Sequence, residues 1–450
     1  MEDVKVIIFI NTVALNGNFE QGGIPMSKKS IVALAHGKDV QENVTRVFDL
    51  MGGVSHMIEE GSTVVLKPNA GHAAPPELAV CTHPETVRAV IREVKKANPK
   101  RIIIAEAAAI GCDTMQCYEA SGIADVAREE GVELIDIKRD KDLINIPVRG
   151  YRSNISHVKL PRFLIEAEHI INLPILKAHA SMVFSCALKN IKGVVQDRVH
   201  IEMHQQNLTM AMMDVWYAAR ADINIVDVMN AASGYSPHTP VPIELDCIMG
   251  SCDPVAVDRV ACELVGIDPE GVDYFRAAEA AGLGTTRMED IVVVGEKVED
   301  CKKKMWVPYL GDIRNRWPEY DVRCEGACSS CQALLTLNME TLKAIGEYDN
   351  HSYLTVVAGG KNTMPEGKPD DQIVLHGNCT RKYLKNCPGA KFIPGCPPGE
   401  GSLYMTVIRD KVICGQDDEM VWIRKRMDDD APAWRAYVEK EAEKFYGPKH

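Results

Sequence analysis

The sequence predicts an α/β protein: a mostly parallel sheet with helices on both faces, followed by a smaller cysteine-rich α+β domain. Between Val4 and Val294, short apolar runs alternate with stretches of helical periodicity, which is the pattern of βαβ units. After Gly295 the composition changes, and six cysteines fall between Cys324 and Cys396. A chain of 450 residues also exceeds one ordinary domain. We therefore expect an α/β domain over residues 1–295, a linker over 296–320 and a cysteine-rich, cluster-binding domain over 321–450.

Bulk composition argues against two classes of protein. The formal net charge is −12, whereas a general nucleic-acid-binding surface would be basic. No apolar run approaches the roughly eighteen residues of a membrane-spanning helix, so we expect no membrane partner. The N-terminal MEDVKVIIFINTVAL lacks a basic start and a small-residue cleavage site, which favours a first strand over a signal peptide. The fifteen cysteines then indicate a reducing cytoplasm, and an exposed cluster would favour an anaerobic setting.

The first half of the chain predicts βαβ units in order. The run VVLKPN, Val64 to Asn69, is typical of a buried strand that ends in a polar turn. In THPETVRAVIREVKKA, Thr82 is the expected N-cap of a helix and Glu85 its capping-box partner. A strand over Arg101 to Ala108 follows, then a helix over residues 123–130 and the strand VELIDI.

The same alternation continues to the end of the first domain. A strand that runs into a loop is expected over His169 to His179, a helix over Met210 to Arg220, and strands over Ile223 to Met229 and Leu245 to Ser251. The run from Asp253 to Gly266 predicts a helix with Asp253 as N-cap and Pro254 at its first position.

Polar residues at the ends of these strands are the candidates for a site. In open parallel sheets, ligands bind beyond the carboxyl ends of the strands. Lysine and asparagine there suit an anionic or carbonyl substrate, and histidines can move protons or bind metal. Each such residue alone is more often a solvated turn residue, but several segments offer the same types. The predicted catalytic residues are Lys67, Lys177, His179, Lys189 and His200; the predicted substrate-binding residues are Asn69, His72, Asn190, Lys192, His204 and Asp227.

The last third predicts a second domain with its own helices and strands. The stretch from Glu296 to Tyr320 is charged and holds two Trp and two Pro, which is typical of a linker across a domain edge. A helix over Leu334 to Ile345, strands over Tyr353 to Gly359 and QIVLHG, and a charged terminal helix from about Asp418 to Phe445 are then expected.

The cysteines of this domain predict a metal centre. The run RCEGACSSCQ has Cys-x3-Cys-x2-Cys spacing, and the turn IPGCPPGEG fixes the backbone around another cysteine. Elsewhere Cys81, Cys186, Cys247 and Cys262 are read as buried core thiols. Spacing alone does not separate an iron–sulfur cluster from zinc. The predicted ligands are Cys324, Cys328, Cys331, Cys379, Cys387 and Cys396.

Three motifs in order resemble one family. The motifs are VVLKPNAG with PPELAVCTHPETVRAVI, LKNIKGVV followed by His200, and SCDPVAVDRVACELVG. Through them the chain is similar to the "domain of unknown function 362" proteins, uncharacterised proteins often described as iron–sulfur centre proteins. The resemblance covers Val64 to Gly266. A fainter one is to the nickel-pincer lactate racemases, which implies a cofactor-tethering lysine, Lys189 or Lys192, and a nickel-ligating histidine, His200 or His204.

These observations leave three functions open. The first is an enzyme with a [4Fe–4S] cluster that acts on a small anionic substrate, with an electron-transfer protein as partner. The second is a binding or scaffold module whose small domain is held together by zinc. The third is a racemase-like nickel enzyme. Radical S-adenosylmethionine enzymes share the cysteine spacing, but the residues that follow do not predict their barrel. Substrate and homo-oligomeric state stay undetermined.

Overall fold

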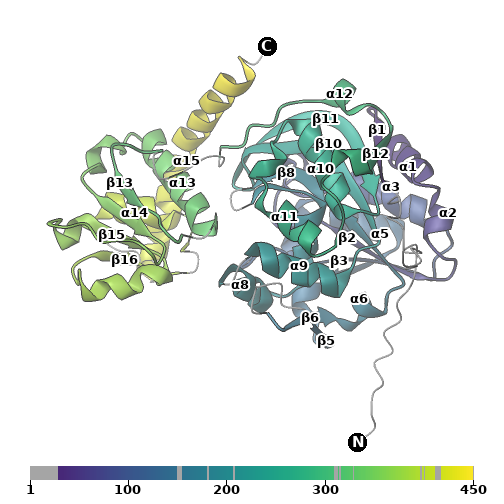
Figure 1. Ribbon diagram of the computed structural model, residues 1–450, viewed down its shortest axis with the longest axis horizontal. Coiled ribbons are helices and arrows are strands. Elements are labelled where there is room, and N and C mark those ends of the chain that lie inside the picture. The colour runs from purple at the N-terminus through teal and green to yellow at the C-terminus, as the bar shows by residue number, and fades with distance from the viewer. Residues whose placement is uncertain are drawn as a thin grey trace, which may run out of the picture.

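The computed structural model describes most of the 450 residues. The described ranges are 29–148, 155–179, 182–205, 208–308, 313, 316–327, 329–395, 398–399, 401–410 and 417–448, without the side chains of 205, 273, 329, 330 and 417–424. The strand expected near Val4 lies outside these ranges. Figure 1 shows a larger and a smaller lobe, with the C-terminal helix lying between them.

The larger lobe is organised around a ten-stranded sheet in the order β12-β1-β11-β10-β7-β2-β3-β4, with β8 and β9 branching from β10. Its pairs are parallel except where β11 meets β1 and β10 and where β9 meets β8. A separate antiparallel pair joins β5 (Leu143–Pro147) and β6 (His157–Pro161). The strands of the large sheet are β1 (Ser30–His36), β2 (Thr63–Pro68), β3 (Arg101–Glu106), β4 (Glu133–Asp136), β7 (His169–Leu173), β8 (Ile175–His179), β9 (Val183–Ser185), β10 (Ile223–Tyr235), β11 (Thr239–Ser251) and β12 (Ile291–Gly295).

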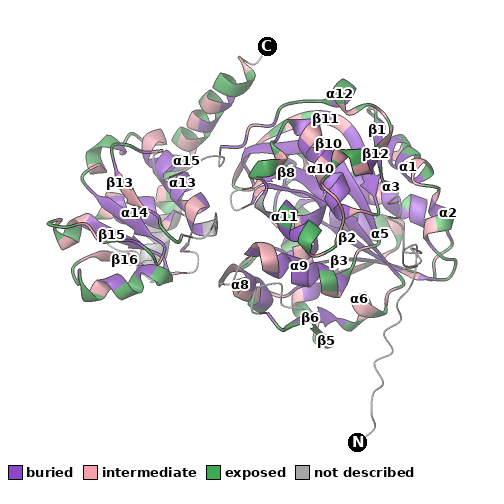
Figure 2. Cartoon of the chain, viewed as in Figure 1, coloured by how far each residue is buried: buried purple, intermediate pink, exposed green. Residues whose placement is uncertain are grey.

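Helices cover both faces of this sheet, because alternate side chains of a strand point to opposite faces. Val64 and Leu66 of β2 join one core, which also contains residues of α1, α3 and α5. Val65 joins the other, against α7, α9 and α10. The strands of this sheet lie mostly in the buried interior of the lobe (Figure 2). The predicted fold class is thereby confirmed. The helices of this lobe are α1 (Val40–Leu50), α2 (Val54–Met57), α3 (Pro84–Lys95), α4 (Thr114–Ala120), α5 (Ile123–Glu130), α6 (Arg162–Glu166), α7 (Ala187–Asn190), α8 (Asp197–Gln205), α9 (Leu208–Ala219), α10 (Pro254–Val265), α11 (Asp273–Ala280) and α12 (Val298–Cys301).

The start of helix α3 differs from the prediction. His83, not Thr82, is the N-cap, and its Nδ1 accepts a hydrogen bond from the amide of Glu85 at 3.2 Å. Pro84 occupies the first helical position, where its missing N–H costs nothing. Thr82 instead donates to the carbonyl of Leu173 at 2.6 Å and accepts from the amide of Asn69 at 2.8 Å. The threonine therefore ties the loop after β2 to strand β7.

The smaller lobe holds four strands in the order β13-β14-β15-β16, all parallel. One face packs against α13 and α14, and a second apolar cluster lies on the other face. None of the helices in the described ranges combines the length and apolarity needed to cross a membrane. The elements are β13 (Asp321–Arg323), α13 (Ser329–Ala344), β14 (Thr355–Ala358), β15 (Ile373–His376), the 3-10 segment η9 (Asn378–Lys385), β16 (Lys391–Ile393), α14 (Ser402–Arg409) and α15 (Asp417–Tyr446).

The two lobes meet along the long hairpin of β10 and β11. Tyr235 of β10 is buried in a cluster with Leu337 of α13 and Val438 of α15. Trp306, in the segment that joins the lobes, packs edge-on against Tyr235 with 5.5 Å between ring centroids. Helix α15 thus contacts both lobes, although it follows the smaller one in the sequence.

Candidate functional site

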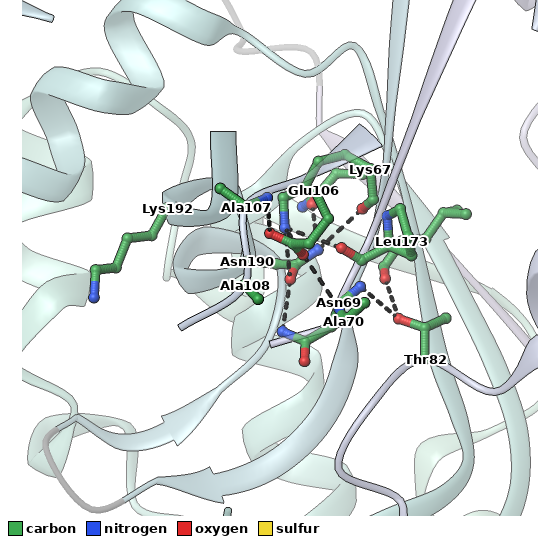
Figure 3. Close-up of polar contacts among 12 residues, drawn as sticks. Lys67, Asn69, Ala70, Thr82, Glu106, Ala107, Ala108, Leu173, Asn190 and Lys192 are labelled. Atoms are coloured by element: carbon green, nitrogen blue, oxygen red, sulfur yellow. Dashed lines mark hydrogen bonds and ion pairs between the residues drawn. The ribbon is translucent and has the colours of Figure 1, made fainter. Parts of the chain in front are cut away.

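The polar residues at the carboxyl ends of β2, β3 and β8 form the centre of the candidate site. These strands belong to one sheet and run in the same direction through β7 and β10, so their carboxyl ends lie along one edge. Lys67 comes from β2, Glu106 from β3 and Lys177 from β8. Helix α7 and the 3-10 turn η3 (Ile191–Val194) close over this edge (Figure 3).

A buried ion pair lies at the base of the site. Lys67 Nζ is 2.7 Å from Glu106 Oε2, and the two side chains are 1% and 2% exposed. The carboxylate also accepts the amides of Ala70 at 3.2 Å and Ala107 at 2.9 Å. Burial lowers the pKa of Lys67 and raises that of Glu106, while their mutual attraction opposes both shifts. Because a buried charge without a partner is costly, each group needs the other.

A relay of asparagine side chains holds this pair in place. Asn190 Oδ1 accepts from Lys67 Nζ at 3.2 Å and from Asn69 Nδ2 at 2.8 Å. Its Nδ2 donates to the Lys67 carbonyl at 3.1 Å and to Asn172 Oδ1 at 2.8 Å. Asn172 in turn donates to Asn224 Oδ1 at 2.9 Å. The relay fixes the orientation of Lys67 and Asn69, and a pre-oriented polar site loses less free energy when a ligand binds.

Lys177 has only neutral hydrogen-bond acceptors. Its Nζ donates to Asn69 Oδ1 at 2.9 Å and to the Val80 carbonyl at 2.6 Å, and the residue is 4% exposed. Burial lowers the pKa of this ammonium to about 8. Asn69 is therefore held between Asn190 and Lys177, with its amide nitrogen turned to Asn190 and its oxygen to Lys177.

Helix α7, the turn η3 and helix α8 bring two more lysines and two histidines to the site. Lys189 and Lys192 are half-buried, and burial lowers the pKa of both, that of Lys192 to about 8. Lys192 Nζ lies 2.9 Å from His204 Nε2. His200 Nε2 lies 2.7 Å from the Lys192 carbonyl and must be the donor, because a carbonyl only accepts. Its Nδ1 is buried and has no hydrogen-bond partner among the described atoms.

The remaining predicted residues divide between the site and the scaffold. His179 is half-buried, and burial together with Lys189 and Lys177 keeps its pKa well below the usual value. His72 lies on the rim, with its ring centroid 6.5 Å from that of His238. Asp227 is fully buried and accepts the amide of His83 at 2.7 Å, so it anchors the start of α3. We therefore do not include Asp227 among the residues that would touch a ligand.

The charges at this edge do not balance. Lys189 is surrounded by the charges of Lys192, Lys177 and Lys67, with Glu106 as the opposing carboxylate. Lys192 also feels Asp197 at the start of α8. Since Glu106 is engaged by Lys67, the structure shows no other buried carboxylate paired with Lys177, Lys189 or Lys192 among the described residues. Unpaired ammonium groups at low exposure are unfavourable, so an anion bound among them would be stabilised.

Three residues of the site were missed by sequence reasoning. Glu106 was taken as an interior residue of a strand that ends at Ala108, whereas β3 ends at Glu106. Gly193 leaves room for the ion pair, because a Cβ there would overlap Glu106 Oε1 and lie 2.6 Å from Lys67 Nζ. Asn172 looked like an ordinary strand residue. A carboxylate at the end of the apolar run RIIIAE was the signal that could have pointed to Glu106.

The cysteine-bearing loops gather at one edge of the smaller sheet. Its four strands are parallel, so Cys324 after β13 and Cys379 after β15 follow carboxyl ends on the same side. A Cβ added to Gly377 would lie 3.6 Å from Cys331 Sγ, and a Cβ added to Gly360 would lie 3.6 Å from the carbonyl oxygen of Cys379. The predicted ligands Cys328 and Cys396 lie outside the described residues. Within those residues, no three Cys, His, Asp or Glu side chains are arranged to hold one metal ion.

Cys387 is placed differently from the other predicted ligands. It is buried in the cluster with Val357, Ile373 and Leu375, and its thiol donates to the Tyr383 carbonyl at 3.1 Å. Cys324 belongs to the apolar cluster of the opposite face. Cys387 lies between β15 and β16, and because these strands are parallel, the chain between them must return to the end of the sheet where the strands begin. This position gives Cys387 the contacts of a core thiol.

His376 is a polar residue of the small domain that lacks partners. It is the last residue of β15, is 0% exposed, and has no hydrogen-bond partner on either ring nitrogen within the described structure. Val374, two residues earlier on the same strand, packs in the cluster that contains Cys324. The imidazole therefore points to the face of Cys324, at the edge where the cysteine loops begin. A buried imidazole without partners is unusual and calls for an explanation.

Curated proteins and solved structures are similar to part of this chain. A thylakoid-associated protein of Synechocystis sp. is 26% identical over 250 residues, which cover 53% of this chain and 74% of that protein. The thylakoid association is a property of that relative, and the cytoplasmic location expected for this chain stays a prediction.

Two solved structures share low similarity. One is a protein of Thermotoga maritima (14% identity, TM-score 0.33, 55% of this chain). The other is the lactate racemase apoprotein of Thermoanaerobacterium thermosaccharolyticum (15% identity, TM-score 0.33, 52% of this chain). The chain spans 59% of each of these structures. TM-scores this low carry no functional inference.

The family match falls on the segment that builds the lysine-rich edge. Lys67, Lys177, Lys189 and Lys192 all lie inside it, whereas the cysteine-bearing sheet follows it. As the three sequence motifs predicted, residues 64–263 match the family described as "Domain of unknown function (DUF362)".

Proposed function

We propose that the protein is an iron–sulfur enzyme, in which the edge formed by β2, β3 and β8 binds a small organic anion and the smaller domain holds the cluster. The observation that carries the first part is the excess of lysine. Lys189 feels the positive charges of Lys192, Lys177 and Lys67, and the carboxylate that opposes them, Glu106, is already engaged by Lys67. A carboxylate or phosphate group would supply the missing negative charge.

The same residues suit the activation of a bound carbonyl or carboxylate. Asn69 and Lys177 are fixed by hydrogen bonds before any ligand arrives, so they would orient its oxygens without reorganisation. His179 is kept neutral at pH 7 by burial and by the neighbouring lysines. A neutral imidazole beside a bound anion can accept a proton.

The smaller domain fits an iron–sulfur cluster on two grounds. Thiols from the β13, α13 and β15 segments reach one sheet edge, and a cluster accepts thiolates from several loops because its irons occupy separate corners. The partnerless imidazole of His376 faces the same side and could donate an N–H to a cluster sulfur. When bound, such a cluster would exchange single electrons with a redox partner. Cys324, Cys331 and Cys379 would hold it, together with Cys328 or Cys396.

Metal analysis of the anaerobically purified full chain tests this proposal. We expect about four irons and about four acid-labile sulfides per chain, with a brown colour, as a cluster with four thiolate ligands requires. Cys379→Ser should lose iron, because its thiol lies at the cluster edge. Cys387→Ser is the matched control and should keep full iron content, because that thiol packs in the opposite core.

Two results would overturn the cluster assignment. One is a colourless protein that contains zinc, which would favour the scaffold function. The other is equal loss of iron in the Cys379→Ser and Cys387→Ser variants, which would mean that iron content only follows the stability of the small domain.

A racemase-like nickel enzyme is a second candidate, supported by His200. Its Nε2–H is fixed by the Lys192 carbonyl, which leaves the lone pair of the buried Nδ1 free. Metal-binding histidines are commonly oriented in this way by a backbone carbonyl. The same analysis would then find nickel in the wild type and less in His200→Gln. It would also find a cofactor mass adduct on Lys189 or Lys192, and absence of both would exclude this candidate.

A further inference from the structure

We propose that Cys112 and Cys117 form a peroxide-reactive dithiol in the wall of the lysine-rich site, with Cys112 as the attacking thiolate and Cys117 as the resolving thiol. Cys112 lies in the loop between β3 and α4, and Cys117 lies within α4. The substrate class is a hydroperoxide, and the product is a disulfide. The anion and cluster proposals play no part in this inference.

Two side chains are hydrogen-bond partners of the Cys112 sulfur. The thiol of Cys117 contacts it as a side-chain hydrogen-bond partner. The Nδ1 atom of His72 lies 4.0 Å from Cys112 Sγ, which is the limit of a hydrogen bond to sulfur. Donors of this kind stabilise a thiolate relative to a thiol.

A lysine fixes the loop that carries Cys112 and adds positive charge. Lys138 Nζ donates to the carbonyls of Ala109 and Cys112 at 2.8 and 2.9 Å. The hydrogen bond with Cys117, then the one with His72, and to a smaller extent the charge of Lys138 lower the pKa of the Cys112 thiol to about 4. The pKa of Cys117 shifts upward, because it shares its proton with Cys112 and is buried.

The two thiols also differ in exposure in the way that this chemistry needs. Cys112 is half-exposed, so a small peroxide can reach it, whereas Cys117 is fully buried. Reactive redox cysteines combine low pKa, access to solvent and an adjacent second thiol. Cys252 is exposed as a residue, but its sulfur is largely desolvated, which raises the pKa of the thiol to about 11.

The reaction balances with one hydroperoxide, ROOH. The Cys112 thiolate attacks one peroxide oxygen, the O–O bond breaks, and RO⁻ leaves and takes up a proton as ROH. Cys112 is then a sulfenic acid. Cys117 loses its proton as its sulfur attacks Cys112, the S–O bond breaks, and hydroxide leaves as water. In total, two thiols and ROOH give a disulfide, ROH and water.

Peptide mass mapping of the full chain tests the proposal. Trypsin would release residues 102–128, which contain Cys112 and Cys117 and no other cysteine. After brief treatment of reduced, anaerobically purified protein with hydrogen peroxide, this peptide should lose two hydrogens. In Cys117→Ser the disulfide cannot form, and Cys112 should be trapped by dimedone as its sulfenic acid. Cys81→Ser, a buried neighbour, should behave as the wild type.

Alkylation rates give a second readout that needs no variant. At pH 6, Cys112 would be almost wholly thiolate, whereas only about 10⁻⁵ of Cys252 would be thiolate. The less basic thiolate of Cys112 is a weaker nucleophile, which reduces this advantage in alkylation rate by about three powers of ten. We expect iodoacetamide to modify Cys112 about a hundredfold faster than Cys252. Equal rates at the two cysteines, no hydrogen loss from peptide 102–128, or a disulfide between Cys117 and Cys81 would each overturn the proposal.

Discussion

Lys177 shows how a single side chain couples burial to charge. Its two hydrogen-bond partners among the described residues are neutral oxygens, from Asn69 and Val80, so neither partner neutralises the ammonium. Desolvation therefore lowers its pKa to about 8. The same lysine would be the group that an incoming anion stabilises most, because pairing removes the cost of the buried charge.

The first prediction follows from the sign of this shift. In the unfolded chain a lysine titrates near 10.5, so between about pH 8 and pH 10.5 the unfolded state holds a proton that the folded state has released. Without a ligand, stability should therefore rise across this window. Anion affinity should fall, because Lys177 loses its charge; phosphate or malonate should bind about tenfold more weakly at pH 9 than at pH 7. Calorimetric titration at both pH values measures this.

Two variants make the pH test specific. Lys177→Met should weaken binding at pH 7 and reduce its dependence on pH to the part that Lys192, whose pKa is also about 8, contributes. Lys100→Met changes an exposed lysine outside the site and should leave both unchanged. If affinity fell by the same factor between pH 7 and pH 9 in Lys177→Met, the dependence would arise elsewhere and the assignment to Lys177 would be wrong.

The turn η3 links the packing of the larger domain to its ion pair. Ala107, just after β3, donates to the Gly193 carbonyl at 2.7 Å, and this contact places the glycine Cα directly over Glu106 and Lys67. A close approach of backbone to a buried pair is possible only without a side chain at that position. The turn therefore acts as a lid over the pair, made from backbone atoms.

The second prediction concerns Gly193→Ala. The added methyl would overlap Glu106 and crowd Lys67, so the ion pair must move or the turn must lift. We expect a loss of about 1–3 kcal/mol in the free energy of unfolding, measured with urea, and weaker anion binding. Gly71→Ala is the matched control on the same edge: its nearest neighbour, Asn69 Oδ1, would be 3.9 Å away, so little change is expected. Equal losses in both variants would contradict this account.

Local sequence signals predicted some elements well and others poorly. Helix α10 begins as expected, with Asp253 accepting the amides of Val255 and Ala256, because Asp followed by Pro is a strong local start signal. The predicted N-cap of α3 was wrong, because Thr82 makes tertiary hydrogen bonds with Leu173 and Asn69 instead. The local sequence does not reveal these contacts.

Long-range pairing limited the prediction further. Strands β10 and β11 extend over 13 residues each, well beyond the predicted end of β10 at Met229 and the predicted start of β11 at Leu245. Their outer halves pair with each other and pack against α15. The lysines and Asn69 could be proposed because parallel strands end at one edge. Glu106 and His376 could not be proposed from the sequence. Their roles depend on which side chains the fold places next to them.

Helix α15 connects the smaller domain to the larger one through side-chain contacts. Trp434 donates from Nε1 to Thr239 Oγ1 at 2.7 Å, and its ring lies 5.0 Å from that of Tyr235 between centroids. Beside this contact is a cavity of about 700 Å³, lined by Leu78 and His238 of the larger domain and by Leu337 and Tyr404 of the smaller one. Because His238 is also the neighbour of His72, the interface between the domains reaches the rim of the candidate site.

The third prediction is that Trp434→Ala loosens the two domains without unfolding either. Trp434 contacts Thr239 and Tyr235 across the interface, so its loss should cost about 2 kcal/mol of domain contact, less than the cost for a fully buried tryptophan. Small-angle scattering should then report a larger radius of gyration, and thermal unfolding should separate into two transitions as the lobes lose their coupling. Lys440→Ala, an exposed position on the same helix, is the control and should scatter as the wild type. An unchanged radius in Trp434→Ala would mean that the link through residues 298–308 alone fixes the arrangement, since Trp306 also packs on Tyr235 and its carbonyl accepts the amide of Gly234 at 2.8 Å.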